Sequence, residues 1–138
     1  MLSSSRFVVA VHVLSLLAKN AGKGPICSST IACSVGTNPV VIRRLMSELE
    51  KSGLILATAG RSGGFSLSKS AVNVSLADIY NAVEDDEVFR MHKLDPNSEC
   101  PVAGKLRDVL VPKLRAAECA LTTSLQLTSL HDVACTIQ

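Results

Sequence analysis

The residues that most constrain this fold lie between Asn38 and Leu67, where a capped amphipathic helix is followed by a short glycine-rich hairpin. Asn38 is suited to cap the helix, and Pro39 suits the first helical position, where its missing N–H loses no hydrogen bond. Gly53 suits the end of the helix, because glycine adopts the left-handed C′ conformation at little cost. The pattern therefore predicts a helix between Asn38 and Gly53.

Apolar residues on this helix recur at steps of three and four, which predicts a single core-facing stripe. The stripe consists of Val41, Ile42, Leu45, Met46 and Leu49. The other side carries mainly polar and basic residues, namely Val40, Arg43, Arg44, Ser47, Glu48 and Lys51. An ordinary amphipathic helix with solvated charges has the same pattern, so the helix alone does not identify a function.

The hairpin that follows is expected to pair the short strands Leu54–Thr58 and Phe65–Leu67. Three glycines at its tip, Gly60, Gly63 and Gly64, allow a tight turn from which Arg61 projects. A thin basic loop of this kind suits the minor groove of DNA, whose negative potential attracts arginine.

A short helix before this one completes a helix-turn-helix arrangement, with the turn at Gly36. Ser28 or Ser29 is expected to cap that short helix and to contact backbone phosphate. The second helix would present its free N–H groups and the positive end of its dipole to DNA. Arg43 or Arg44 would then reach guanine or phosphate.

The distribution of charge supports contact with a polyanion on one face. The chain has 138 residues and a net charge of +2. Residues 23–69 hold six basic and two acidic side chains, a net charge of +4, whereas residues 70–138 hold six basic and ten acidic, a net charge of −4. Positive charge is thus concentrated around the helix and the hairpin. Aromatic residues make up only 3%, with no Trp, which argues against a stacking platform for single-stranded nucleic acid.

The second half of the chain reads as helices separated by a loop. Ser75 is expected to cap a helix over Leu76–Val83, and loop signals follow up to Pro101. From Pro101 a long helical pattern resumes, and Pro112 inside it should kink the helix or split it in two. The tail from Ala120 to Gln138 carries one formal charge and needs apolar cover. A two-fold partner is the simplest source of that cover, and packing back onto the chain's own domain is the alternative.

Five cysteines, at positions 27, 33, 100, 119 and 135, show no spacing typical of a disulfide framework or a compact ligand cluster. We interpret them as thiols in a reducing cytoplasm, with Cys33 as a small buried hydrophobe. The apolar run Phe7–Ala18 is too short to span a bilayer and lacks a cleavage signal, so it predicts a buried first helix, over Ser3–Lys19, and no membrane association.

The ordered set of motifs resembles the Rrf2-type winged-helix transcription regulators of bacteria. The resemblance covers nearly the whole chain and is carried by SSRFVVAVHVLSLLA, NPVVIRRLMSELEKSGL, RSGGFSLSK and VSLADIYNAVE. It implies a homodimer held by the long C-terminal helix and DNA bound by the second helix of the helix-turn-helix and by the wing. Matching positions assign DNA contacts to Asn38, Pro39, Val40, Arg43, Arg44, Arg61, Ser62, Gly63 and Gly64.

Many members of that family bind an iron–sulfur cluster through three closely spaced cysteines before the long helix. Here the corresponding region, DEVFRMHKLDPNSECPVAGKL, contains only Cys100. One thiolate, even with His92, does not supply the ligands of such a cluster. The sequence therefore predicts no cluster, no metal and no other cofactor. Cys100 is the candidate sensor, because a helix N-terminus would favour its thiolate. An inert residue at a helix N-terminus is the other interpretation.

The predicted fold is mainly α with a small β-hairpin wing: a winged helix-turn-helix in residues 1–85, a linker or sensor loop in 86–101 and dimerisation helices in 102–138. The predicted dimer interface consists of Leu106, Leu110, Leu114, Ala117, Leu121 and Leu125. The predicted function is that of a cytoplasmic, sequence-specific regulator of double-stranded DNA, most simply a repressor, switched at Cys100 or by a small-molecule or protein effector. A winged-helix protein-interaction module that does not bind DNA is the alternative. An enzyme using Cys100 as nucleophile is not expected, because no histidine–acid pair accompanies it.

Overall fold

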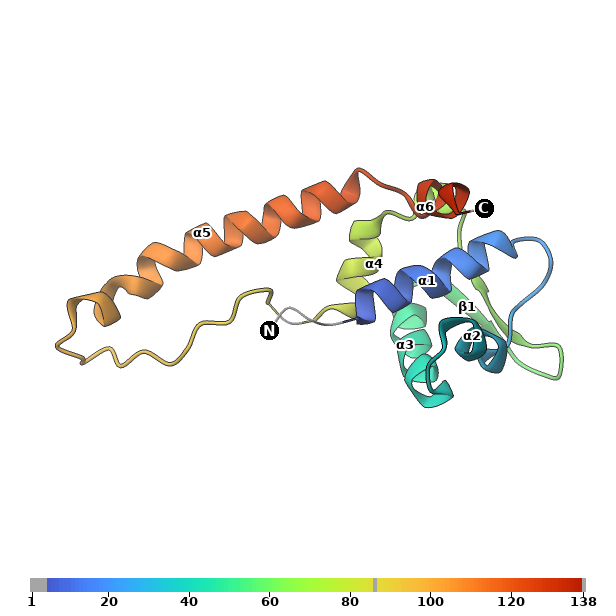
Figure 1. Ribbon diagram of the computed structural model, residues 1–138, viewed down its shortest axis with the longest axis horizontal. Helices are drawn as coiled ribbons and strands as arrows, with labels where there is room; N and C mark the ends of the chain where they lie inside the picture. Colours follow the sequence, from blue (N-terminus) through green and yellow to red (C-terminus); the bar gives the residue numbers. More distant parts are fainter. Residues whose placement is uncertain (1–4, 86, 138) are drawn as a thin grey trace.

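The computed structural model describes residues 5–85 and 87–137, which form a winged-helix body and one long projecting helix (Figure 1). The elements follow in the order α1 (Arg6–Lys19), α2 (Ser28–Val35), α3 (Pro39–Lys51), β1 (Ile55–Thr58), β2 (Gly64–Leu67), η1 (Ala71–Asn73), α4 (Leu76–Val83), α5 (Pro101–Gln126) and α6 (Leu130–Thr136). This arrangement confirms the predicted fold class. The start of the predicted first helix, before residue 5, lies outside the described residues.

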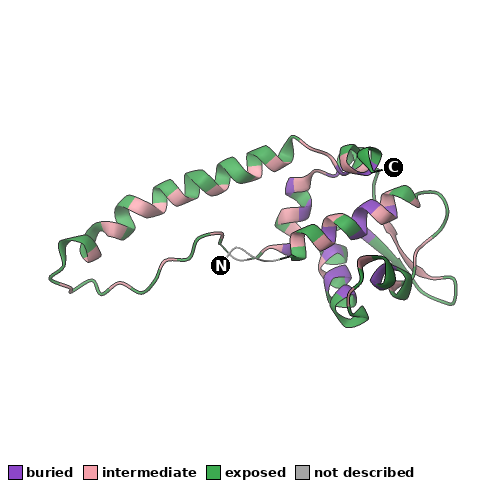
Figure 2. Cartoon of the chain, viewed as in Figure 1, coloured by how far each residue is buried: buried purple, intermediate pink, exposed green. Residues whose placement is uncertain are grey.

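The core of the body is formed where α1, α3 and α4 pack together (Figure 2). Ala10, Val13 and Leu14 face inward from α1, while Ile42, Met46 and Leu49 face inward from α3. Burying such side chains contributes about 1.5–3 kcal/mol each. One face of α3 therefore packs in the core, and the opposite face is exposed to solvent.

Two expectations about buried residues are wrong. Val41 is 52% exposed, because it lies at the edge of the buried face of α3. Beside it, the N-terminal end of α1 leaves a cavity rather than covering the side chain. Cys33 is also exposed. The eight-residue helix α2 buries only Ile31 and Ala32, and Cys33 lies outside that narrow face.

The hairpin pairs β1 and β2 antiparallel, in the register Ile55 with Leu67 through Thr58 with Gly64. A backbone bridge joins the hairpin to the segment before α2: Ile26 donates to the Phe65 carbonyl at 2.9 Å, and Phe65 donates to the Ile26 carbonyl at 2.8 Å. The wing is therefore tied directly to the helix-turn-helix.

Helix α5 runs through Pro112 without interruption. Of the two outcomes expected at Pro112, the split into two helices is wrong, because a proline removes one backbone hydrogen bond and crowds one turn, while the helix on either side keeps its own bonds. The kink stays a prediction. None of the described residues of α5 is buried, and the helix projects away from the body (Figure 2).

The end of the chain finds its apolar cover within the same chain, as the alternative interpretation expected. Helix α6 packs on α1, and Leu130 is fully buried in the core. Backbone bonds from Leu130 to Val74 at 2.7 Å and from Leu76 to Thr128 at 2.9 Å fix the approach to α6 against the start of α4. The predicted division into a DNA-binding domain (1–85), a linker (86–101) and dimerisation helices (102–138) stays a prediction. Within the last of these segments, α6 lies on the winged-helix body.

We expect Leu130→Ala to lower the free energy of unfolding by about 2–5 kcal/mol, since it leaves a cavity in the core. Leu127→Ala, three residues earlier, is the matched control: Leu127 is 83% exposed, and its loss should change stability by less than about 0.5 kcal/mol. Urea unfolding at one chain concentration measures both. Equal effects would show that α6 does not belong to the core.

Candidate nucleic-acid interface

Helix α3 is held at its N-terminus by a side-chain cap. The Asn38 side-chain oxygen accepts a hydrogen bond from the Val40 N–H at 2.8 Å, and Pro39 follows at the first helical position. Gly53, at the other end, has φ +81°, the left-handed conformation expected there. The predicted boundaries and cap of this helix are confirmed. The side of α3 that faces away from the core is exposed, and it carries Val40, Arg43, Arg44, Ser47 and Lys51.

Helix α2 packs against α3 across a turn at Gly36, which has φ +76°. Ser28 and Ser29 lie in the first turn of α2, as predicted, but neither caps it: the N-cap residue is Cys27. Both serines remain near the helix N-terminus, where backbone N–H groups are available to an anion.

The tip of the hairpin needs glycine for steric reasons. A Cβ at Gly63 would lie 2.1 Å from the Thr58 carbonyl oxygen, and one at Gly64 would lie 2.3 Å from that of Ile26. Side chains at these two positions would open the turn and break the bridge to Ile26. Arg61 and Ser62 are exposed at the tip, so the structure leaves them available for contact with a groove.

The sequence-predicted DNA-binding residues come together on one side of the body. Helices α2 and α3 and the hairpin tip lie on the side opposite α6 (Figure 1). Arg43, Arg44 and Arg61 are all exposed there. Arg43 lies back along α3, with Nε donating to the Pro39 carbonyl at 3.4 Å. Glu48, beside them, forms an ion pair with Arg6 of α1. That pair neutralises one of the two acidic residues near this surface.

Cys27 is a chemically distinct residue that reasoning from the sequence missed. Its sulfur lies 3.2 Å from the Ser29 hydroxyl and 3.1 Å from the Thr30 hydroxyl. These hydroxyls, helped by the backbone N–H of Thr30, lower the pKa of the Cys27 thiol to about 7. The signal in the sequence is a cysteine directly before Ser-Ser-Thr at a helix start.

Cys100 is the N-cap residue of α5 and is exposed, so it occupies the helix N-terminus expected of the candidate sensor. The backbone N–H groups of Ala103 and Val102 lower the pKa of its thiol. Its own N–H donates to the Ser98 hydroxyl at 3.2 Å. Helix α5 begins at the end of the molecule far from the wing, so this thiol is remote from the predicted DNA contacts (Figure 1).

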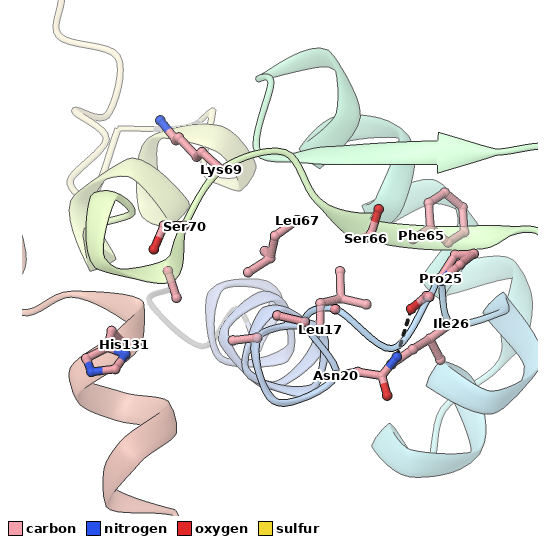
Figure 3. A pocket seen from close by; sticks show the side chains of 15 residues that line it. Leu17, Asn20, Pro25, Ile26, Phe65, Ser66, Leu67, Lys69, Ser70 and His131 are labelled. Carbon is pink, nitrogen blue, oxygen red and sulfur yellow. Dashed lines mark hydrogen bonds between the residues drawn. The ribbon is translucent and has the colours of Figure 1, made fainter.

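A groove of about 530 Å³ lies behind the wing, where the end of α1, the loop 20–26, β2 and α6 meet (Figure 3). Leu17 and Leu67 contribute apolar walls, and Lys69 and His131 contribute the basic groups. The Cys135 sulfur lies 3.2 Å from Nε2 of His131. The small-molecule effector considered from the sequence would have room here.

The Rrf2 family, described as "Iron-dependent Transcriptional regulator", matches residues 3–136. YwnA of Bacillus subtilis (strain 168), named among the HTH-type transcriptional regulators, is 38% identical over 131 residues, which are 94% of this chain and 95% of YwnA. The structure of Staphylococcus aureus CymR is similar, with a TM-score of 0.66 and 25% identity, covering 95% of this chain and 96% of CymR. T. potens IscR shares the fold, with a TM-score of 0.74 at 19% identity, covering 100% of this chain and 89% of IscR.

The iron dependence in the family's description can be compared with the available ligands. Within residues 5–85 and 87–137, no group of three or more His, Cys, Asp or Glu side chains converges to hold a metal ion. Cys100 is the one cysteine in the segment before α5. These residues of a single chain do not fit an iron centre, and the absence of a cluster stays a prediction. No helix among them is long and apolar enough to cross a membrane.

We expect the alkylation rate of Cys27 by iodoacetamide to rise with pH and reach half its maximum near pH 7, because the thiolate reacts and its pKa is lowered to about 7. An ordinary thiol would show a midpoint near pH 8.5. Ser29→Ala removes a hydrogen bond to the thiolate and should shift the midpoint upward. Peptide mass spectrometry resolves Cys27 from the other four cysteines. An ordinary midpoint, unchanged in Ser29→Ala, would contradict this assignment.

Proposed function

Because the chain belongs to the Rrf2 family of transcriptional regulators, and is thus a regulator rather than an enzyme, we propose that it is a sequence-specific repressor that binds DNA as a homodimer. The membership agrees with the resemblance found in its motifs. The observation that supports the proposal is that α2, α3 and the hairpin tip lie on the same side of the body (Figure 1), and that Arg43, Arg44 and Arg61 on these elements are exposed.

The proposed contacts follow from that surface. The start of α3, with Asn38, Pro39 and Val40, would enter the major groove, and Arg43 and Arg44 would reach guanine or phosphate. At the hairpin tip Arg61 would enter the minor groove, with Ser62 and the half-buried Gly63 and Gly64 against the DNA backbone. Ser28 and Ser29 would bind phosphate at the start of α2. A module that binds only protein would not require exposed arginines on both α3 and the hairpin tip.

We expect Arg43→Ala and Arg61→Ala each to weaken binding to the operator about fivefold to 150-fold, since each removes a contact worth about 1–3 kcal/mol. Loss of a phosphate contact should also reduce the salt dependence of binding by about one ion. Lys93→Ala, which removes one positive charge from the loop before α5, is the matched control and should bind as the unaltered protein does.

Fragments selected from genomic DNA supply the operator, and titrations at several salt concentrations provide the measurement. If no duplex is retained even at low salt, the protein-interaction module becomes the better description of this protein.

The homodimer is proposed because α5 has no buried residue in the single chain. A helix of 26 residues without one buried residue leaves an unpaired apolar side, which a second copy would cover. The predicted interface residues Leu106, Leu110, Leu114, Ala117, Leu121 and Leu125 lie on this helix, all half-buried or exposed in the single chain. At 1.5 Å per residue α5 is about 39 Å long. That length is comparable to one turn of DNA, which separates the half-sites of a palindrome.

We expect Leu121→Asp to convert the dimer to monomers, because it would bury an unpaired charge in the interface. Leu121 is 38% exposed in the single chain, so the body should keep its helical circular-dichroism signal. Ala116→Asp puts the same charge at an exposed position of α5 outside the predicted interface and should remain dimeric. Sedimentation gives the mass of each variant. A dimeric Leu121→Asp protein would place the interface elsewhere.

Cys100 is proposed as the regulatory thiol. It is exposed, its pKa is lowered, and it stands where the loop 87–100 turns into α5. Oxidation there adds bulk and polarity at that junction, which would alter the angle between α5 and the body and thus the spacing of the two α3 helices. The second modifiable thiol, Cys27, lies within the proposed DNA interface itself.

Treatment with hydrogen peroxide is expected to reduce operator affinity of the unaltered protein and to leave Cys100→Ser unaffected. Cys27→Ser is the comparison that separates a switch in α5 from direct damage to the interface. Should Cys100→Ser lose binding as the unaltered protein does while Cys27→Ser resists, the sensing thiol is Cys27. Equal affinity with and without peroxide would leave Cys100 as an inert helix N-cap.

A further inference from the structure

The exposed side of α3 begins with an apolar side chain. Val40 precedes the buried Leu49 by nine residues, about two and a half helical turns, so the two lie on opposite sides of the helix. Leu49 is fully buried, whereas Val40 is 54% exposed. Further along the same exposed side come Arg44, Ser47 and Lys51. Val40 therefore lies at the N-terminal end of the surface that the proposed function places against base edges.

The residues beside Val40 at the start of α3 offer few hydrogen-bonding groups to a base. Pro39 has no N–H and no polar side-chain atom. The Asn38 side-chain oxygen is occupied by the Val40 N–H, which leaves only its NH₂ group. Arg43, one turn further on, has its Nε directed to the Pro39 carbonyl and keeps its terminal N–H groups for phosphate or guanine. The first turn of α3 thus presents a predominantly apolar surface, followed by long basic side chains that suit phosphate.

We propose that Val40 recognises thymine by contact with its C5-methyl group, at one position in each half-site of the operator. The inference rests on the proposed function and adds a base identity to it. The thymine methyl is the one apolar group among the base edges in the major groove. Over cytosine or guanine, a valine would cover N4 or O6 without offering a hydrogen-bond partner, and burying such a group unpaired is unfavourable.

Val41 provides a matched comparison in the same turn. It is 52% exposed, almost as much as Val40, but lies about a quarter turn away. There it lines a cavity of about 200 Å³ with Arg6 and Val9 of α1 and Arg44 of α3. Val41 faces the body of the protein rather than the proposed groove, so exposure alone does not make a valine a reader of bases.

The experiment uses the full-length protein and its selected operator, in which each thymine is replaced in turn by deoxyuridine. Deoxyuridine pairs with adenine as thymine does and lacks only the methyl group. For the unaltered protein, one position per half-site should lose about fourfold in affinity, the factor that follows from one buried methyl group. In Val40→Ser the same substitution should have no effect, whereas Val41→Ser should keep the full fourfold difference.

Each possible result bears on a different claim. If the unaltered protein binds thymine and uracil operators equally at every position, or if Val40→Ser retains the difference, recognition of thymine by Val40 is wrong while DNA binding stands. If the thymine operator itself is not bound, the proposed function is wrong. Circular dichroism of both serine variants confirms that the fold is kept, since both positions are exposed.

Discussion

The two backbone hydrogen bonds between Ile26 and Phe65 hold together the parts of this molecule that would meet DNA. They join the segment leading into α2 to the second strand of the hairpin, and they exist because residue 64 has no side chain. A Cβ there would lie 2.3 Å from the Ile26 carbonyl oxygen, well inside van der Waals contact. The position of the wing relative to the helix-turn-helix thus depends on one glycine.

From this constraint the functional surface follows. Helix α3 is fixed from behind by Ile42, Met46 and Leu49. Its front is free to present one valine and then arginines and a lysine. The arrangement separates two tasks that DNA recognition requires: a short apolar group near the bases and long charged groups near the phosphates. Helix α6 closes the body on the far side, so the same core that seats α3 also anchors the end of the helix proposed to join two copies.

Reasoning from the sequence was most successful where the determinants are local. The Asn38 cap and Gly53 end of α3 are confirmed, and so is Ser75 as the cap of α4, since capping and left-handed turns depend on a few neighbouring residues. It failed for Val41, for Cys33 and for a split at Pro112, and also for the cap of α2, which is Cys27 rather than Ser28 or Ser29. The burial of Val41 and Cys33 depends on how much of α3 and α2 the neighbouring helices cover. The split at Pro112 depends on how much helix remains on either side of one lost hydrogen bond.

The sequence by itself determined the order of the elements, the location of the basic residues and the membership of a family, because periodicity, capping residues and ordered motifs are written along the chain. Only the tertiary structure decided that α6 returns to α1, that Cys27 lies between two hydroxyls at the start of α2 and that Val41 stays half exposed at the edge of the buried face of α3. These facts depend on contacts between segments far apart in the chain or on the orientation of single side chains. Neither is encoded in the spacing of residues along one helix.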